Sequence, residues 1–344
     1  MKCCICDNPV SRNSIKYLHN SCKHESYDHL FTELSIKLCD NCGLGFAYPA
    51  PDSSLLADFY QTTYKNNPNL ERWIDSNSIS QLLTGKLFVD FNENDVFVDV
   101  GAGVGLSFVT ASFLLENPKL VAIELKQKAI TICKKRFPGI KIYNSVKQAV
   151  ISGFRNSAKI VLMSHSLEHF SWDQIIETLE GVKDLLNDEG VLIIDVPNDD
   201  FRTQKKDIRK NDTPHLYFFS LESILLLLKL TGFKVLYYGL FHRKISDACN
   251  FKHQHNEKSL NEKNNRISTL LGLKQMLRSL ISRLMPLSLK AKFKKIWSYR
   301  LVDIHKLRRE EIFTLLKSPS FYSGSNRRVI RLVVKKGKTL KCQY

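Results

Sequence analysis

The sequence predicts an α/β fold in which helices cover a doubly wound, mostly parallel sheet. The first observation behind this prediction is the apolar run 96–100, which leads into a turn with alternating glycines, Gly101, Gly103 and Gly105. A strand that enters a glycine-rich turn and then a helix is how α/β proteins seat a nucleotide. The second observation is that apolar runs alternate with helical segments over residues 85–245, as expected for strands joined by crossover helices.

Six short apolar stretches of this central region are expected to be strands of the sheet. The turns between strands and helices are short, which favours a doubly wound arrangement. The expected strands are 95–100, 119–124, 140–143, 158–163, 190–196 and 233–239.

The composition agrees with a folded α/β protein. The chain has 344 residues, of which 43% are hydrophobic and 25% charged, as in soluble globular proteins. No stretch is long and apolar enough to cross a bilayer, and the N-terminal residues lack the apolar core of a signal peptide. The nine cysteines are therefore expected to be thiols or metal ligands, and the protein is expected to be cytoplasmic.

The positive charge of the chain is concentrated in its C-terminal part. Residues 241–344 hold 25 Lys and Arg and 6 Asp and Glu, whereas residues 1–240 are nearly neutral. Leucines recur there every three or four residues, as on one face of a helix, and bases accompany them. Three interpretations stay open: a lid or dimer helix, a helix on an anionic membrane surface over 267–300, and a nucleic-acid patch. The leucine stripe consists of Leu270, Leu273, Leu277, Leu280, Leu284 and Leu287.

Two pairs of cysteines near the N-terminus have the spacing of a zinc site. Cys3 with Cys6 and Cys39 with Cys42 each form a C-x-x-C knuckle, and two knuckles can surround one tetrahedral Zn²⁺. Four protein ligands close the coordination sphere, so this zinc is expected to be structural. Cys4 is a rival of Cys3, and reduced thiols without a metal are the alternative. The long gap between the knuckles holds further possible ligands, namely His19, Cys22 and His24.

The glycine-rich turn departs from the pattern of a dinucleotide site. The sequence is D-x-G-x-G-x-G, with Asp99 two residues before the first glycine and leucine where G-x-G-x-x-G requires the third glycine. A carboxylate so near disfavours a pyrophosphate but tolerates a cationic amino-acid group. Glu124 ends the next expected strand, where an acid is suited to bind ribose hydroxyls. The candidate cofactor site is therefore Asp99, Gly101, Gly103, Gly105 and Glu124.

With these features, the sequence resembles the class I S-adenosylmethionine-dependent methyltransferases. The similarity continues through AKIVLMSHSLEHF (158–170), LLNDEGVLIIDVPN (185–198) and TPHLYFFSLESILLLLKLTGFKVLYYG (213–239). RRVIRLVVKKG (327–337) resembles the last strand, which is expected to pair antiparallel. The resemblance implies a Rossmann-like, mostly parallel sheet of seven strands and S-adenosylmethionine as the cofactor.

The N-terminal part narrows this resemblance. LCDNCGLGFAYPAPDSSLLADFYQTTY (38–64) is similar to the start of a subgroup that carries a zinc-binding module before the methyltransferase core. That subgroup includes C-methyltransferases of nucleotide-linked deoxysugars and relatives from bacterial surface-polysaccharide pathways. Its C-methyltransferases carry a further folded domain after the core, whereas residues 245–325 here are basic and helical in pattern. The resemblance implies a small, sugar-linked acceptor and leaves open whether O, N or C is methylated.

The methyl group of a sulfonium is already activated, so the protein mainly has to align the acceptor and remove its proton. His169 is the first candidate for the general base, because the ordinary pKa of imidazole lies near neutrality. Glu168 is expected to orient His169 or to bind a substrate hydroxyl, and His165 is the rival base. His215, which precedes the sequence LYFFS, is expected on a loop that reaches the substrate. Two tyrosines of the connector, Tyr60 and Tyr64, are expected to fold over the pocket.

The sequence thus predicts a zinc-containing, S-adenosylmethionine-dependent methyltransferase. One alternative is an RNA methyltransferase, which the basic tail and the zinc knuckles favour. Another alternative is a methyltransferase fold without activity that serves as an interaction module. The expected regions are a zinc module at 1–50, a helical connector at 51–84, the core at 85–245, a basic helical insertion at 246–325, and the last strand and tail at 326–344.

Overall fold

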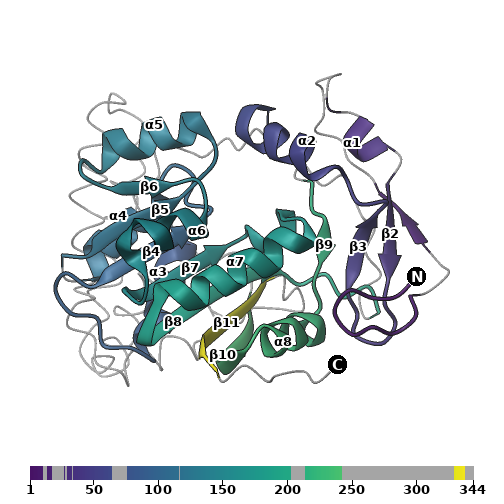
Figure 1. The fold of residues 1–344 in the computed structure, drawn as a ribbon. Coiled ribbons are helices and arrows are strands. Elements are labelled where there is room, and N and C mark those ends of the chain that lie inside the picture. Colours follow the sequence, from purple (N-terminus) through teal and green to yellow (C-terminus); the bar gives the residue numbers. More distant parts are fainter. Residues whose placement is uncertain are drawn as a thin grey trace, which may run out of the picture.

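The computed structural model places most of the chain that precedes the basic C-terminal region, together with the last strand (Figure 1). It describes residues 1–10, 14–17, 27, 29–32, 34–63, 76–115, 117–202, 214–241 and 329–337. No helix in these ranges combines the length and the apolar character that a membrane span requires. The leucine stripe, the membrane segment expected at 267–300, Tyr64, His19, Cys22 and His24 lie outside the described residues.

A seven-stranded sheet forms the centre of the molecule. Its strands are β4 (Val96–Val100), β5 (Lys119–Ile123), β6 (Lys141–Tyr143), β7 (Ala158–Ser164), β8 (Leu186–Pro197), β10 (Phe233–Phe241) and β11 (Val329–Lys336). Their order in the sheet is β10-β11-β8-β7-β4-β5-β6. The strands from β4 to β8 are parallel, and β11 runs antiparallel between β8 and β10. This arrangement confirms the predicted Rossmann-like, mostly parallel sheet and its antiparallel last strand.

The fifth strand of the parallel set is longer than expected. β8 begins at Leu186, which pairs with Ala158, whereas the sequence placed the start of this strand at residue 190. A register shift follows, after which Val191 pairs with Ile160. The polar residues between Leu186 and Val191 interrupt the apolar run, so the hydrophobic pattern missed the first part of the strand.

Helices cover both faces of this sheet. Alternate residues of a strand point to opposite faces, so one strand contributes to two apolar cores. In β4, Val96, Val98 and Val100 belong to one apolar core, and Phe97 belongs to the other. The first core includes α6 (Val146–Ala149), α7 (Trp172–Leu185) and α8 (Leu221–Leu230), and the second includes α3 (Ser76–Lys86), α4 (Leu106–Leu114) and α5 (Gln127–Arg136).

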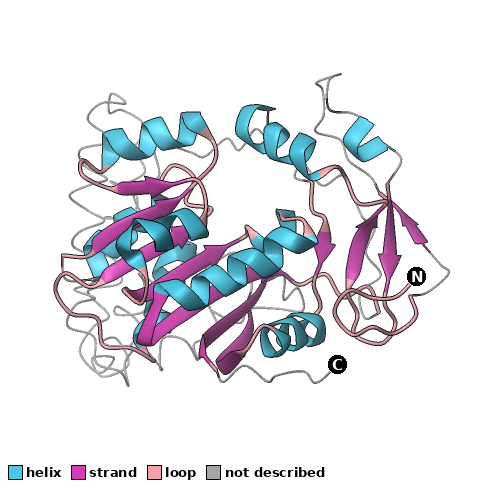
Figure 2. Cartoon of the chain, viewed as in Figure 1, coloured by secondary structure: helices cyan, strands magenta, loops and turns pink. Residues whose placement is uncertain are grey.

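A second, smaller sheet joins the N-terminal region to the core (Figure 2). Its antiparallel strands are, in spatial order, β1 (Ser14–Lys16), β2 (Ser35–Leu38), β3 (Gly45–Tyr48) and β9 (Tyr217–Phe218). Because β9 follows β8 in the chain, the core completes the sheet of the N-terminal region. Leu216 strengthens this junction, since its N–H donates to the Glu168 carbonyl and its own carbonyl accepts from Ala47 N–H, both at 2.8 Å.

The connector begins with α2 (Ser53–Asp58) and a π-helical turn, η1 (Phe59–Thr63), whereas α1 (His29–Thr32) lies between β1 and β2 in the chain. Asp52 caps α2, because its carboxylate accepts from the N–H groups of Ser54 and Leu55. In η1, Phe59 packs edge-on against Phe31 in the core of the small sheet, with ring centroids 5.3 Å apart. The hydroxyl of the next residue, Tyr60, lies within hydrogen-bond distance of His169 Nδ1 and of the Pro214 carbonyl. The connector therefore joins the N-terminal core to the candidate site.

A buried ion pair holds the last strand in place. Arg331 and Asp195 are each 2% exposed, and Arg331 Nε and Nη2 donate to the two carboxylate oxygens of Asp195 at 2.8 and 2.7 Å. Gln81 of α3 donates to the same carboxylate at 2.8 Å, and Arg331 Nη1 donates to Ser80 Oγ. This network connects β11, β8 and α3 even though the long segment 242–328 separates β11 from β10 in the chain.

Removing the arginine should therefore destabilise the protein strongly. In Arg331→Met, Asp195 stays behind as a buried carboxylate without its cation, which costs about 3–5 kcal/mol of unfolding free energy. The double variant Asp195→Asn/Arg331→Met should recover much of this loss, because it removes the charge that has lost its partner. Urea unfolding measures both values, and a wild-type midpoint for Arg331→Met would show that the pair contributes little.

Candidate active site

The glycine-rich turn follows β4 directly and is built from glycines in the left-handed region of backbone space. The φ angles are +83° at Gly101, +53° at Gly103 and +79° at Gly105, where other residues are strained. Gly101 N–H donates to the carbonyl of Ile123 in β5 at 2.9 Å, and Gly105 is the N-cap of α4. The turn is therefore fixed between β4, β5 and the start of α4.

The three glycines have different surroundings. A Cβ atom at Gly103 would meet no described atom within 4 Å, so this residue borders open space. At Gly101 the added atom would lie 2.9 Å from Ser166 Cβ, and at Gly105 it would lie 2.9 Å from the ring of Phe137. Gly105 therefore permits close packing of α4 on α5, whereas Gly103 faces the side of the turn on which a ligand could bind.

Glu124 follows β5 and presents its carboxylate to this turn. Oε2 accepts a hydrogen bond from Gly103 N–H at 2.7 Å, while Oε1 accepts from the N–H groups of Leu125 and Lys126 at 2.9 and 2.8 Å. The backbone thus holds the carboxylate beside the open side of Gly103. An acid at the end of this strand is in the position from which α/β proteins bind the hydroxyls of a ribose.

Asp99 is buried at the end of β4 and accepts a hydrogen bond from the hydroxyl of Ser107 in α4. Burial raises the pKa of Asp99 to about 7, Ser107 offsets part of this rise, and the negative charge of Glu124 adds to it. Both protonation states of this carboxyl are therefore populated near neutral pH. A cationic ligand group close by would favour the ionised state.

A second group of polar residues follows β7, the strand next to β4 in the sheet. His165 adopts a positive φ of 53°, and its N–H donates to the Asp195 carbonyl at 2.9 Å. A short 3₁₀ turn, Leu167–His169, comes next and carries Glu168. Because Ser166 lies against Gly101, this segment is a direct neighbour of the glycine-rich turn.

Glu168 places a carboxyl group in the interior. It is 1% exposed, and neither of its oxygens accepts a hydrogen bond from the residues that the structure describes. The nearest charged partner is His165, whose Nδ1 lies 3.4 Å from Oε1. Burial by itself would raise the pKa of Glu168, but the imidazoles of His165, His169 and His215 lower it to about 2.

His169 has a defined tautomer. Its Nδ1 lies 2.9 Å from the carbonyl oxygen of Pro214 and 3.0 Å from the hydroxyl oxygen of Tyr60, which donates to the same carbonyl at 2.9 Å. Because a carbonyl only accepts hydrogen bonds, we assign the proton to Nδ1, which leaves the lone pair on Nε2. Burial lowers the pKa of His169, and the nearby charge of Glu168 offsets part of this effect.

His215 comes from the segment that leads into β9. Its ring lies across that of His169, with centroids 4.8 Å apart and planes at 75°, and its carbonyl accepts from the Tyr17 hydroxyl at 2.9 Å. Polar atoms of Glu168, His169 and His215 lie within 4.8 Å of one another, and we call these residues the Glu-His-His cluster. No sequence pattern pointed to Tyr17, and although Pro214 lies in the segment 213–239, no pattern there indicated a role for its carbonyl.

The two cysteine knuckles also meet in space. Cys3 Sγ and Cys42 Sγ are 3.7 Å apart, Cys6 Sγ and Cys39 Sγ are 3.4 Å apart, and all four sulfurs lie within 4.8 Å of one another. Cys4 is exposed and is not part of this four-cysteine cluster. The cluster lies against the start of α8, because the N-cap Ser220 donates its hydroxyl to the Cys42 carbonyl at 2.6 Å.

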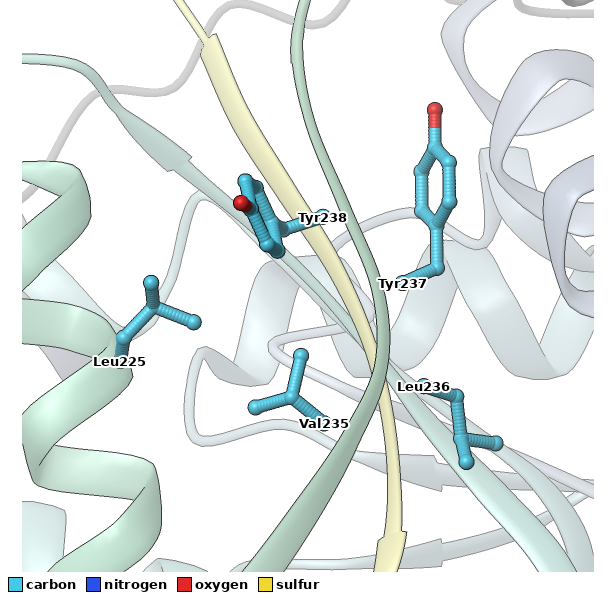
Figure 3. Close-up of a pocket in the computed structure, with 5 residues that line it drawn as sticks. All are labelled: Leu225, Val235, Leu236, Tyr237 and Tyr238. Carbon is cyan, nitrogen blue, oxygen red and sulfur yellow. The ribbon is translucent and has the colours of Figure 1, made fainter.

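The pocket in Figure 3 lies elsewhere in the molecule. It is an open depression of about 390 Å³ between α8 and β10. β10 is an edge strand, and β11, β8 and β7 separate it from β4, so the pocket is remote from the glycine-rich turn. Its lining is mainly apolar and consists of Leu225, Val235, Leu236, Tyr237 and Tyr238.

The seven-stranded sheet and the glycine-rich turn define an α/β domain, and part of it is similar to a known family. Residues 73–238 match the family described as a methyltransferase domain. The matched stretch holds the glycine-rich turn, Glu124 and the whole Glu-His-His cluster, so the candidate site lies within the part of the chain that is similar to this family. Comparison with curated protein sequences gives no match.

Solved structures with a similar fold include enzymes of different chemistry. The 1,6-didemethyltoxoflavin-N1-methyltransferase of Burkholderia thailandensis, solved with S-adenosylhomocysteine, is 18% identical over 60% of this chain and 88% of its own, with a TM-score of 0.42. A SAM dependent methyltransferase from Archaeoglobus fulgidus is 14% identical over 72% and 88%, with a TM-score of 0.38. The [4+2]-cyclase SpnF is 12% identical over 78% and 86%, with a TM-score of 0.41. Similarities this low assign neither a reaction nor a substrate.

Alanine substitutions at two glycines should separate ligand binding from packing. In Gly103→Ala the added methyl group enters the open side of the turn, so binding of S-adenosylhomocysteine should weaken about tenfold, or by about 1.4 kcal/mol, and the positive φ should lower the Tm only by the backbone strain that both variants share. In Gly105→Ala the methyl group also meets Phe137, so the Tm should fall by several degrees more than in Gly103→Ala. Calorimetric titration and thermal unfolding measure the two effects. Wild-type affinity in Gly103→Ala would contradict the placement of the ligand.

Proposed function

We propose that the protein is an S-adenosylmethionine-dependent methyltransferase that acts on a small, sugar-linked acceptor. The observation that carries the proposal is the hydrogen bond from Gly103 N–H to Glu124, which places a fixed carboxylate beside open space at the ends of neighbouring strands. The match of 73–238 to methyltransferase domains supports the same cofactor. The sugar-linked acceptor is supported by the similarity of 38–64 to the zinc-containing group of sugar methyltransferases.

The residues around the turn fit this cofactor. Space beyond Gly103 is what a close-lying ligand requires, because a side chain there would fill the cradle. Glu124 would accept hydrogen bonds from the ribose hydroxyls, and Gly101 and Asp99 would lie near the amino-acid part. When bound, S-adenosylmethionine supplies an activated methyl group on sulfur. The protein then has to align the acceptor and weaken the bond to its proton.

The Glu-His-His cluster is the part of the site that would act on the acceptor. It follows β7, which lies beside β4, and Ser166 brings it against Gly101. Nε2 of His169 has the lone pair that can act on the proton of an acceptor group, and Tyr60 and the Pro214 carbonyl hold the imidazole in this tautomer. Glu168 supplies a fixed negative charge beside the imidazole.

We also propose that the four-cysteine cluster holds a structural Zn²⁺. Zn–S bonds of about 2.3 Å in a tetrahedral site place neighbouring sulfurs about 3.8 Å apart. The sulfur separations of 3.7 and 3.4 Å are close to this value. Four thiolates leave no coordination position for a substrate. The ion would instead hold both knuckles against α8, where Ser220 binds the Cys42 carbonyl.

Two variants test the enzymatic proposal separately. Glu124→Gln should weaken S-adenosylhomocysteine binding about tenfold or more in calorimetry, because the amide replaces an acceptor for ribose hydroxyls with a donor. His169→Gln should bind S-adenosylhomocysteine like the wild type, but should lower kcat about 10²–10⁴-fold with nucleotide-linked deoxysugars and methyl-labelled S-adenosylmethionine. A wild-type protein that does not bind S-adenosylhomocysteine would refute the proposal.

The zinc proposal has a matched pair of cysteine variants. Cys39→Ser should lose the ion and make residues 1–50 sensitive to protease, because three thiolates no longer close the site. Cys4→Ser should keep the ion, since Cys4 lies outside the cluster. Elemental analysis and limited proteolysis measure both effects. Equal metal content in the two variants would rule out the four-cysteine cluster as the ligand set.

A further inference from the structure

Glu168 has a carboxyl group that the described protein does not satisfy with hydrogen bonds. It is 1% exposed, and both carboxylate oxygens are buried with no hydrogen-bond donor among the residues in the described ranges. A buried ionised carboxylate is costly unless it is paired, hydrogen-bonded or bound to a metal ion. The buried position of Glu168 therefore favours a cation or a metal ion beside its carboxyl group.

Two imidazoles stand where such a charge would be held. Polar atoms of Glu168, His169 and His215 lie within 4.8 Å of one another, and the rings of the two histidines meet nearly at right angles, with planes at 75°. Two imidazole nitrogens and one carboxylate are a ligand set that suits divalent first-row transition metals. Glu168 and His169 share one short turn, whereas His215 comes from the segment before β9, so folding creates the set.

The surroundings of His169 resemble those of a metal ligand. A histidine that binds a metal through one nitrogen usually donates the other N–H to a carbonyl or carboxylate, which fixes the ring and the tautomer. Here Nδ1 lies 2.9 Å from the Pro214 carbonyl oxygen, to which it donates in the assigned tautomer, and the Tyr60 hydroxyl donates to the same carbonyl. Pro214 is adjacent to His215 in the chain, so one segment provides both the second ligand and the group that orients the first.

We propose that Glu168, His169 and His215 bind a divalent transition-metal ion on the acceptor side of the site. This inference rests on the proposed function. It makes the Glu-His-His cluster a metal site instead of a general base with a carboxylate beside it. Three protein ligands leave coordination positions open, as in catalytic rather than structural metal sites. Those positions suit an acceptor with two adjacent oxygen atoms, such as a hydroxyl next to a carbonyl or to a second hydroxyl. The ion would then lower the pKa of the acceptor hydroxyl, whose proton would pass to solvent water, while His169 Nε2 would serve as a ligand.

A protonated His165 is the alternative partner of the buried Glu168 carboxylate. Its Nδ1 lies 3.4 Å from Glu168 Oε1, and 29% of its side chain is exposed, so a protonated His165 could supply the positive charge without any metal. In that case Glu168 and His165 form an ion pair at the edge of the site. The two explanations differ in the metal content of the folded protein.

The experiment counts zinc in the full chain after loading with Zn²⁺ and gel filtration. Wild type should hold one ion more per chain than Glu168→Gln, whatever the four-cysteine cluster contains. His215→Ala should show the same loss, because it removes a ligand from a different segment. Glu124→Gln is the matched control, since it makes the same carboxylate-to-amide change in the cofactor cradle and should keep the full zinc content.

Binding of S-adenosylhomocysteine is measured on the same samples. Glu168→Gln should bind it with wild-type affinity, which shows that the variant is folded, whereas Glu124→Gln should not. Equal zinc in wild type, Glu168→Gln and His215→Ala would overturn the metal proposal and favour the His165 ion pair, even if the ligand still binds. A wild-type protein that does not bind S-adenosylhomocysteine would instead refute the proposed function.

Discussion

The buried ion pair between Arg331 and Asp195 is the interaction on which the rest of the large sheet depends. It connects β11 to β8 with two charge-assisted hydrogen bonds, and Gln81 of α3 donates a further hydrogen bond to the carboxylate. An ion pair in the interior stabilises a protein only when its geometry and its remaining hydrogen bonds are well satisfied. Here both conditions hold, so the pair fixes the last strand despite the long segment that precedes it.

The same aspartate connects the sheet to the candidate site. The Asp195 carbonyl accepts a hydrogen bond from His165 N–H, at the point where the chain leaves β7 and enters the turn with Glu168. The Glu168 carbonyl in turn accepts from Leu216 N–H, next to His215. The backbone therefore links β8, the acidic turn and the segment before β9, and this explains how a buried carboxylate can be held beside two imidazoles.

The N-terminal region contributes contacts to the segment that carries the Glu-His-His cluster. Its sheet takes β9 from the core, Tyr17 donates to the His215 carbonyl, and Tyr60 supports the carbonyl that orients His169. A metal ion in the four-cysteine cluster would stabilise the start of α8, a short distance along the chain from β9. Stability of the N-terminal region and the geometry of the Glu-His-His cluster are therefore expected to be coupled.

The sequence by itself determined where the glycine-rich turn and its neighbouring carboxylates lie. Asp99, the three glycines and Glu124 lie at the ends of adjacent parallel strands, and the period of strands and helices is enough to predict this meeting. The meeting of the two cysteine knuckles was also predictable, because the C-x-x-C spacing favours four thiols around one point. Only the tertiary structure brought the Glu-His-His cluster together. The burial of Glu168, the tautomer of His169 and the approach of His215 depend on β9 joining a distant sheet and on Arg331 closing the large one, and contacts between such remote segments leave no local pattern in the sequence.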